Sequence, residues 1–262
     1  MPVNRSLYVQ AIYKSSFPSW QCGCCGAGTL QLVKNSLESF QTAESRKARQ
    51  HPDWDPEWIE FRFVCLAKCT SDACGEIATV TGTGETLLCF DEDPRTYQTI
   101  ERWEERYAPR FICPATRLFV ISEDIPDATT TELRRAFELF WVDRSACVNT
   151  LRAALEVALD DLKINKFKIK KGKGKSRRLR LSLHERIERL PAKYSSVRQS
   201  LTAAKWIGNA GSHGQSINTD DAFDALDLVE HSLNGLFDKS SQKLASLAKR
   251  VSAKRGPLGG VH

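Results

Sequence analysis

The stretch Lys205-Trp206-Ile207-Gly208-Asn209-Ala210-Gly211-Ser212-His213 lies between two segments whose apolar residues recur at helical spacing. Asn209 and His213 are four positions apart, which puts both side chains on one face of a helix or helical turn. The two glycines allow a neighbouring backbone or a ligand to come close. The alternative is a structural stretch, in which Gly208 ends a helix, Asn209 is a turn residue and His213 has ordinary polar partners.

Around this stretch, a 3.6-residue apolar period extends over the chain from Pro126 onward. It predicts an all-α helical bundle over residues 126–240. One helix is opened by the capping box Ser182–Glu185 and another is capped by Thr219. The other expected helices cover residues 131–142, 145–162 and 196–207.

A charged pair accompanies the second of these helices. Arg152 lies at the edge of the apolar stripe, and Glu156 follows it at i+4. One interpretation is a surface ion pair worth roughly a few tenths of a kcal/mol. The other is that Arg152 points into a polar site between helices, and the sequence leaves both open.

The N-terminal part carries two cysteine turns. Cys22 and Cys25 form a C-x2-C pair, Cys69 and Cys74 form a C-x4-C pair, and a glycine follows each pair. Apolar residues alternate before the second pair, and a β-rich segment follows it, which is the layout of a zinc ribbon. We therefore predict one tetrahedral, structural Zn²⁺ bound by these four thiolates.

Other residues could replace a ligand. Cys24, Cys65 and His51 are the substitutes near the two turns, although Cys65 falls in the strand alternation and is expected to be buried. Three further cysteines have apolar neighbours and are expected to be core thiols, namely Cys89, Cys113 and Cys147.

These patterns predict an α+β protein with a zinc-ribbon-like β domain over residues 1–125, which contains an inserted loop, followed by the bundle. Residues 7–13 alternate weakly, as in a strand, and residues 86–90 predict a further short strand. From residue 99 to the boundary near residue 125 we expect a charged, proline-punctuated linker.

Positive charge is concentrated in two segments. Residues 163–180 hold ten Lys or Arg and no acid, and residues 239–262 hold six more and no acid. Because the whole chain carries +6, the remainder carries −10 once these sixteen cations are set aside. A flexible basic loop and a basic tail over residues 241–262 are expected, and such segments attract polyanions. The alternative is a solvated insertion with no ligand. The expected nucleic-acid contacts are Lys170, Lys171, Lys173, Lys175, Arg177, Arg178 and Arg180.

Several classes of protein are disfavoured. No apolar run reaches the ~18–20 residues of a membrane span, and the N-terminus has no signal-peptide core. Nine cysteines, an odd count without secretory context, favour reduced thiols or a metal over disulfides. We expect a cytoplasmic protein that has no membrane partner.

In combination, the cysteine module, Arg152-x-x-x-Glu156 and Gly208-Asn209-x-x-x-His213 resemble the bacterial domain of unknown function 4145, a branch of the HEPN superfamily. The resemblance covers roughly residues 17–240. It implies a HEPN-like bundle of four to five helices, often dimeric, in prokaryotic defence and toxin–antitoxin settings. Many relatives are fused to restriction or nuclease subunits or encoded beside them.

Active HEPN ribonucleases pair an Arg and a polar residue with a His, and here Gly208 stands where the Arg is expected. The resemblance leaves two functions. One is a non-catalytic, nucleic-acid-associated accessory protein of a defence system, acting as a dimeric zinc-stabilised platform that contacts nucleic acid or a protein partner. The other is a metal-independent ribonuclease. Its candidate catalytic residues are His213, Asn209, Arg152, Glu156 and Lys205. In this mechanism His213 transfers protons, Asn209 orients His213, and Arg152 or Lys205 stabilises the negative charge on the phosphate.

Overall fold

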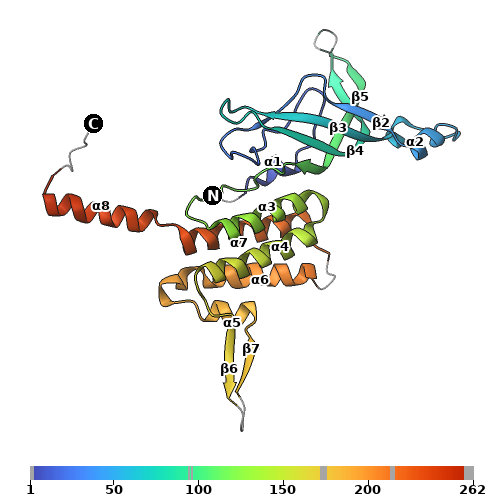
Figure 1. Ribbon diagram of the computed structural model, residues 1–262. Coiled ribbons are helices and arrows are strands. Elements are labelled where there is room, and N and C mark those ends of the chain that lie inside the picture. Colours follow the sequence, from blue (N-terminus) through green and yellow to red (C-terminus); the bar gives the residue numbers. More distant parts are fainter. Residues whose placement is uncertain (1–2, 94, 96, 172–175, 213–215, 257–262) are drawn as a thin grey trace.

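The computed structural model describes residues 3–93, 95, 97–171, 176–212 and 216–256. A curled antiparallel sheet forms the N-terminal part and a helical bundle forms the C-terminal part (Figure 1). The predicted α+β class is confirmed. Within the described ranges, no helix combines the length and the apolar composition of a membrane span.

The N-terminal sheet has five strands in the order β1-β3-β4-β5, with β2 also pairing with β3. β4 and β5 form a long hairpin, paired from Thr79 and Cys113 to Glu92 and Thr99. The sequence predicted a β-rich segment after the second cysteine pair, a further short strand and then a linker, so the sheet is larger than expected. The strands are β1 (Leu30–Leu32), β2 (Glu38–Gln41), β3 (Glu60–Cys69), β4 (Ile77–Glu92) and β5 (Thr99–Cys113).

β3 shows how the sequence builds this sheet. Phe63, Cys65 and Ala67 are buried, whereas the intervening Val64 and Leu66 are both 37% exposed. This alternation is the period of two that a strand imposes when one face covers a core.

Short helices flank the sheet: α1 (Arg5–Val9), α2 (Ala43–Ala48) and a 3-10 turn, η1 (Pro56–Trp58). The strand predicted from the weak alternation of residues 7–13 is wrong. Asn4 instead caps α1, because its side chain accepts the Leu7 amide at 3.3 Å.

The bundle is organised around α4, which packs against α3, α5, α6 and α7. Its buried stripe runs from Cys147 to Leu159 and includes Leu151 and Leu155. The helices are α3 (Asp127–Val142), α4 (Arg144–Asp161), α5 (Leu183–Glu188), α6 (Arg198–Ser212), α7 (Thr219–Phe237) and α8 (Ser240–Lys254), with a 3-10 segment, η2 (Ala192–Val197), before α6.

The glycine-rich stretch belongs to α6, so the interpretation of Gly208 as a helix end is wrong. The glycines serve the close approach of a neighbouring helix instead. A Cβ atom at Gly208 would lie 2.7 Å from the Cβ of Arg152 and 3.1 Å from the carbonyl oxygen of Val148. A Cβ atom at Gly211 would lie 2.8 Å from the carbonyl oxygen of Ser145. α4 therefore lies against α6 at a distance that only glycine allows.

The predicted flexible loop at residues 163–180 is also corrected. It contains an antiparallel hairpin of β6 (Phe167–Lys171) and β7 (Ser176–Arg180), paired from Phe167 with Arg180 to Lys171 with Ser176. The hairpin projects from the bundle on the side opposite the N-terminal sheet, and α8 also extends away from the body (Figure 1).

A single apolar core joins the sheet to the bundle. The Trp20 and Trp141 rings meet edge to face with centroids 5.2 Å apart. The Tyr8 ring also meets the Trp141 ring, with centroids 6.4 Å apart. The predicted boundary near residue 125 falls in the segment between β5 and α3. The two parts are therefore successive in the chain but packed together.

Candidate functional site

The four predicted metal ligands lie together at the end of the N-terminal sheet. The Sγ atoms of Cys22, Cys25, Cys69 and Cys74 are all within 4.8 Å of one another. Two of the pairs are closer: Cys22 to Cys74 at 3.9 Å and Cys25 to Cys69 at 3.7 Å. Four sulfurs at the usual Zn–S distance from a tetrahedral ion are about 3.8 Å apart. The donor set therefore fits a metal ion.

Glycines shape both cysteine turns. Gly26 and Gly75, which follow the second cysteine of each pair, have positive φ values of 66° and 61°. Only glycine adopts this conformation without strain. The repeated Cys-Gly ending in the sequence thus reflects a backbone requirement.

Backbone amides point at the sulfurs. The amides of Ala27 and Gly28 lie 3.4 Å from Cys25 Sγ, and Ser71 donates to Cys69 Sγ at 3.4 Å. The hydrogen bonds from Gly28 and Ala27 lower the pKa of the Cys25 thiol to about 6, whereas burial raises the pKa of Cys69 to about 12. Amide donors support thiolate charge, which a metal ligand requires.

The substitute ligands lie outside the cluster. Cys24 is exposed and donates to Glu76 at 3.3 Å, Cys65 is buried under the sheet, and His51 lies beside Trp58. Of the predicted core thiols, only Cys147 is buried. The prediction is wrong for Cys89, which is half-buried, and for Cys113, which is exposed, because both lie on the β4–β5 hairpin outside the core.

Arg117 holds the first cysteine turn and was missed at the sequence level. Its guanidinium donates to the carbonyl oxygens of Gly23 at 3.2 Å and Cys24 at 2.6 Å. The carbonyl oxygen of Arg117 accepts from the Tyr8 hydroxyl at 2.5 Å. An isolated Arg in a linker carries no pattern by which the sequence could have indicated this role.

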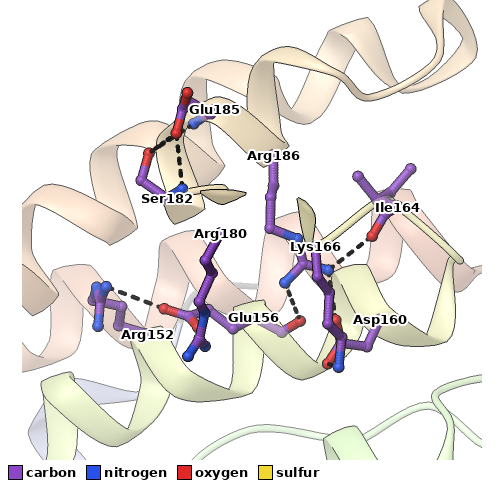
Figure 2. Close-up of polar contacts among 9 residues, drawn as sticks. All are labelled: Arg152, Glu156, Asp160, Ile164, Lys166, Arg180, Ser182, Glu185 and Arg186. Carbon is purple, nitrogen blue, oxygen red and sulfur yellow. Dashed lines mark hydrogen bonds and ion pairs between the residues drawn. The ribbon is translucent and has the colours of Figure 1, made fainter. Parts of the chain in front are cut away.

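The second predicted site is on α4. Arg152 forms an ion pair with Glu156 at 3.1 Å, so the ion-pair interpretation is confirmed (Figure 2). The other oxygen of Glu156 lies 3.4 Å from Arg180 of β7. These three side chains line an open cavity of about 480 Å³, together with Glu132, Arg135 and Asp160. Arginines and carboxylates balance there, which disfavours a strong attraction for phosphate.

Of the remaining predicted catalytic residues, Lys205 and Asn209 are not among the described residues that line this cavity. Lys205 is buried, with Nζ 3.3 Å from the centroid of the Trp206 ring. Burial, with a smaller contribution from the nearby Arg152 charge, lowers its pKa. Asn209 is half-buried in α6, and His213 lies outside the described residues.

Acidic residues of the bundle hold the end of the hairpin that is nearest to the bundle (Figure 2). We call this end the root of the hairpin; it comprises residues 166–168 and Arg180. Lys166 pairs with Asp160 at 2.5 Å, and Lys168 pairs with Glu185 of the α5 capping box. Arg186, only 4% exposed, donates to Asp160 at 2.6 Å and to the carbonyl oxygens of Glu156 and Ile164 at 3.1 Å. One buried guanidinium on α5 thus holds both α4 and the segment that leads from α4 to β6.

Cations farther along the hairpin have no acidic partner among the described side chains. Lys170, Arg177 and Arg178 are exposed and make no ion pair there. Arg178 stacks over the Phe167 ring at 3.7 Å, and Ile169 on the same face is 71% exposed. The backbone of Lys171 lies in β6, and Lys173 and Lys175 lie outside the described residues. The part of the hairpin beyond the root, which includes Lys170, Arg177 and Arg178, is here called the outer hairpin. It is therefore a cationic surface whose charge no described carboxylate neutralises, and it has apolar side chains on one face.

The fold and the cysteine cluster define a two-part protein, in which a sheet with a candidate metal centre precedes a helical bundle. Residues 134–254 match the family model described as Domain of unknown function (DUF4145). Residues 10–112 match a second, Domain of unknown function (DUF8608). The predicted resemblance to domain of unknown function 4145 is thus confirmed for the helical part, whereas the cysteine-containing part matches a different family model. No curated protein and no solved structure shows a significant match to the chain.

Replacing one clustered cysteine tests the metal centre. We expect purified protein to contain one metal ion per chain, measured by plasma mass spectrometry, and Cys69→Ser to lose it. Loss of a structural metal should lower the melting temperature by about 10 °C, equivalent to roughly 3 kcal/mol. Cys24→Ser removes a thiol next to the cluster and should change neither quantity. Equal metal content in the Cys69 variant would contradict this assignment.

Removing Arg186 tests the hairpin anchor. Arg186→Met leaves two carbonyl oxygens without this donor and Asp160 with only Lys166, so we expect about 2 kcal/mol of destabilisation in urea. Amide hydrogen exchange in β6 should accelerate at the same time. Arg189→Met, an exposed arginine on the same turn, provides the control. Unchanged exchange in the Arg186 variant would show that the hairpin is held by other contacts.

Proposed function

We propose that this protein binds nucleic acid through the outer part of the β6–β7 hairpin. The bundle and the metal-stabilised sheet serve as its platform, without catalysing a reaction. The observation that carries this proposal is the distribution of charge along the hairpin. Root cations are neutralised by acids of α4 and α5, whereas Lys170, Arg177 and Arg178 face solvent and have no acidic partner in the part of the chain that the structure describes.

The division of the hairpin cations into paired and unpaired groups determines which of them can bind a phosphate. Cations already paired with carboxylates gain little from a phosphate, because they must first break an existing interaction. Unpaired, exposed cations release condensed counterions when they meet a polyanion, and this drives binding. Because the root is anchored, the hairpin is already ordered before binding. It therefore loses less conformational entropy on binding than a flexible basic loop would.

The shape of the hairpin supports the same ligand. A two-stranded ribbon is narrow enough to enter the major groove of a DNA duplex. The stacked Arg178 and Phe167 and the exposed Ile169 add apolar contact area, which an unpaired base could also use. We favour duplex contact, because the cations of the paired strands lie along both edges of the ribbon.

We also propose that the metal is Zn²⁺ in a structural role. Four thiolates in a tetrahedral arrangement suit zinc, and four protein ligands leave no position for substrate. When bound, the ion would cross-link β3 to the two cysteine turns. The dimeric state, the prokaryotic defence setting and the cytoplasmic location also belong to this proposal. They are supported by the family resemblance and by nine free cysteines.

A second candidate function is metal-independent RNA cleavage, and one observation favours it. Arg152 of α4 passes directly over Gly208, the position where the family resemblance implies an arginine. The aliphatic part of the Arg152 side chain thus covers this position, so an arginine from a neighbouring helix stands beside it. The ion pair between Arg152 and Glu156 counts against it, because it already neutralises that charge.

Charge removal on the hairpin tests the binding proposal. We expect Lys170→Gln combined with Arg177→Gln to weaken binding to a short DNA duplex by about tenfold. The slope of log affinity against log salt should fall by about 2, or about 1 per lost phosphate contact. Lys34→Gln with Lys47→Gln removes the same charge from the exposed surface of the sheet domain and should change affinity less than about twofold. Fluorescence anisotropy across a salt series gives both values, and an unchanged slope in the hairpin variant would reject the proposal.

Incubation with labelled single-stranded RNA separates the two candidates. We expect full-length RNA to persist with wild-type protein and with His213→Ala, because a binding platform has no general base at work. Gel electrophoresis of the products, without added divalent cations, provides the readout. Cleavage by wild type that disappears in the His213 variant, with binding retained, would instead establish the ribonuclease.

A further inference from the structure

A cavity of about 360 Å³ lies at the seam between the sheet and the helical bundle. Its walls come from the end of α1 and the residues after it, from β4 and β5, from the end of α3, and from the first residues of α4 and α7. It therefore takes residues from both segments that match separate families, residues 10–112 and 134–254. Any occupant of this seam cavity would contact both parts of the protein.

Arginines dominate the polar lining of the seam cavity. Arg106 and Arg110 come from β5 and Arg144 from α4, and among the described lining residues the only carboxylate is Glu85. Glu85 is already engaged, because Arg106 donates to it through Nε at 2.9 Å. Arg110 and Arg144 have no carboxylate partner in the described part of the chain. The site thus carries an excess of positive charge that no described side chain offsets.

The positions of these arginines are set by the fold. Arg106 and Arg110 flank Ala108, whose small side chain leaves space between them on the sheet. Arg144 packs against the Phe140 ring, with its guanidinium carbon 5.9 Å from the ring centroid. Packing of this kind reduces the side-chain entropy that ligand binding would otherwise cost.

An adjoining cavity of about the same volume continues over the sheet. It shares Glu85, Arg106 and Arg110 with the seam cavity and adds Arg62 and Glu60. The combined groove therefore has four guanidinium groups and two carboxylates. Its net charge is positive, although the chain outside its two basic segments is acidic.

We propose that the seam cavity binds a small phosphate-bearing molecule. Guanidinium groups bind phosphate oxygens in pairs, and three of them from two elements can engage several oxygens of a phosphate or diphosphate at once. A single carboxylate has too few acceptors for that arrangement. The volume lies within the range of roughly 300–1,000 Å³ for small-molecule sites. The apolar walls of Val9 and Phe140 also leave room for an organic group.

This proposal does not depend on nucleic-acid binding by the hairpin. The seam cavity lies between the sheet and the bundle, whereas the hairpin projects from the far side of the bundle (Figure 1). Either proposal can therefore fail while the other holds.

Titration calorimetry with the full chain tests the seam cavity. The probes are inorganic pyrophosphate and ATP, with adenosine as the probe without phosphate and citrate as the carboxylate probe. We expect pyrophosphate and ATP to bind and adenosine and citrate not to bind. Arg110→Gln and Arg144→Gln should each weaken ATP binding by about tenfold or more, as the loss of a charge-assisted hydrogen bond implies.

Controls address folding and location. Arg110 is exposed, so Arg110→Gln should keep the melting temperature of wild type, and Arg110→Lys should recover part of the affinity. Arg178→Gln removes one charge from the hairpin and should leave ATP binding unchanged within about twofold. Absence of binding by both phosphate probes at millimolar concentration would overturn the proposal. Binding of citrate in their place, or equal loss in the hairpin variant, would also overturn it.

Discussion

The contact between α4 and α6 is the constraint on which the bundle depends. It requires residues without side chains at positions 208 and 211, because α4 atoms occupy the space that a Cβ atom would need. Close approach brings more atoms of each helix into van der Waals contact, and this supports burial of the α4 stripe. The same constraint accounts for the absence of an arginine at position 208. A side chain there would collide with Arg152 and crowd the Val148 carbonyl oxygen, so the packing of α4 on α6 excludes an arginine at this position.

The polar edge of α4 extends this organisation to the hairpin. Arg152, Glu156 and Asp160 follow at intervals of four, so they form one row along the helix. Glu156 pairs with Arg180 of β7, and Asp160 pairs with Lys166, just before β6, and with the buried Arg186 of α5. One face of α4 thus holds the core, and its edge sets the direction in which the hairpin leaves the bundle.

Predictions succeeded where the signal is local in the sequence. The helical period after Pro126 and the two cysteine turns depend on neighbours within a few residues, and the structure confirms both. β5 was missed because its charged residues, such as Arg102 and Arg106, look like a linker. Their partners, Asp91 and Glu85, lie on the adjacent strand and become neighbours only after pairing.

The hairpin was missed for a related reason. Its lysines and glycines resemble a flexible loop, and the acids that hold it, Asp160 and Glu185, are on two separate helices. Arg117 and the arginines of the seam cavity show no spacing pattern in the sequence. Arg117 reaches the cysteine turn, and the seam arginines of β5 and α4 reach one another, only in the folded chain. Chemistry built from isolated residues on different elements is therefore the part of this protein that a single sequence could not indicate.

The seam cavity, the helical bundle and the cysteine cluster are connected through the N-terminal segment. Tyr8 contributes to the wall of the seam cavity, packs on Trp141 of the bundle and donates its hydroxyl to the Arg117 carbonyl oxygen. Arg117 in turn grips the cysteine turn that presents Cys22 and Cys25. A metal that fixes this turn would also fix Arg117, and with it the tyrosine at the seam. The cysteine cluster and the seam cavity are thus connected through Arg117 and Tyr8, and a metal bound at the cluster would help to fix this wall of the cavity.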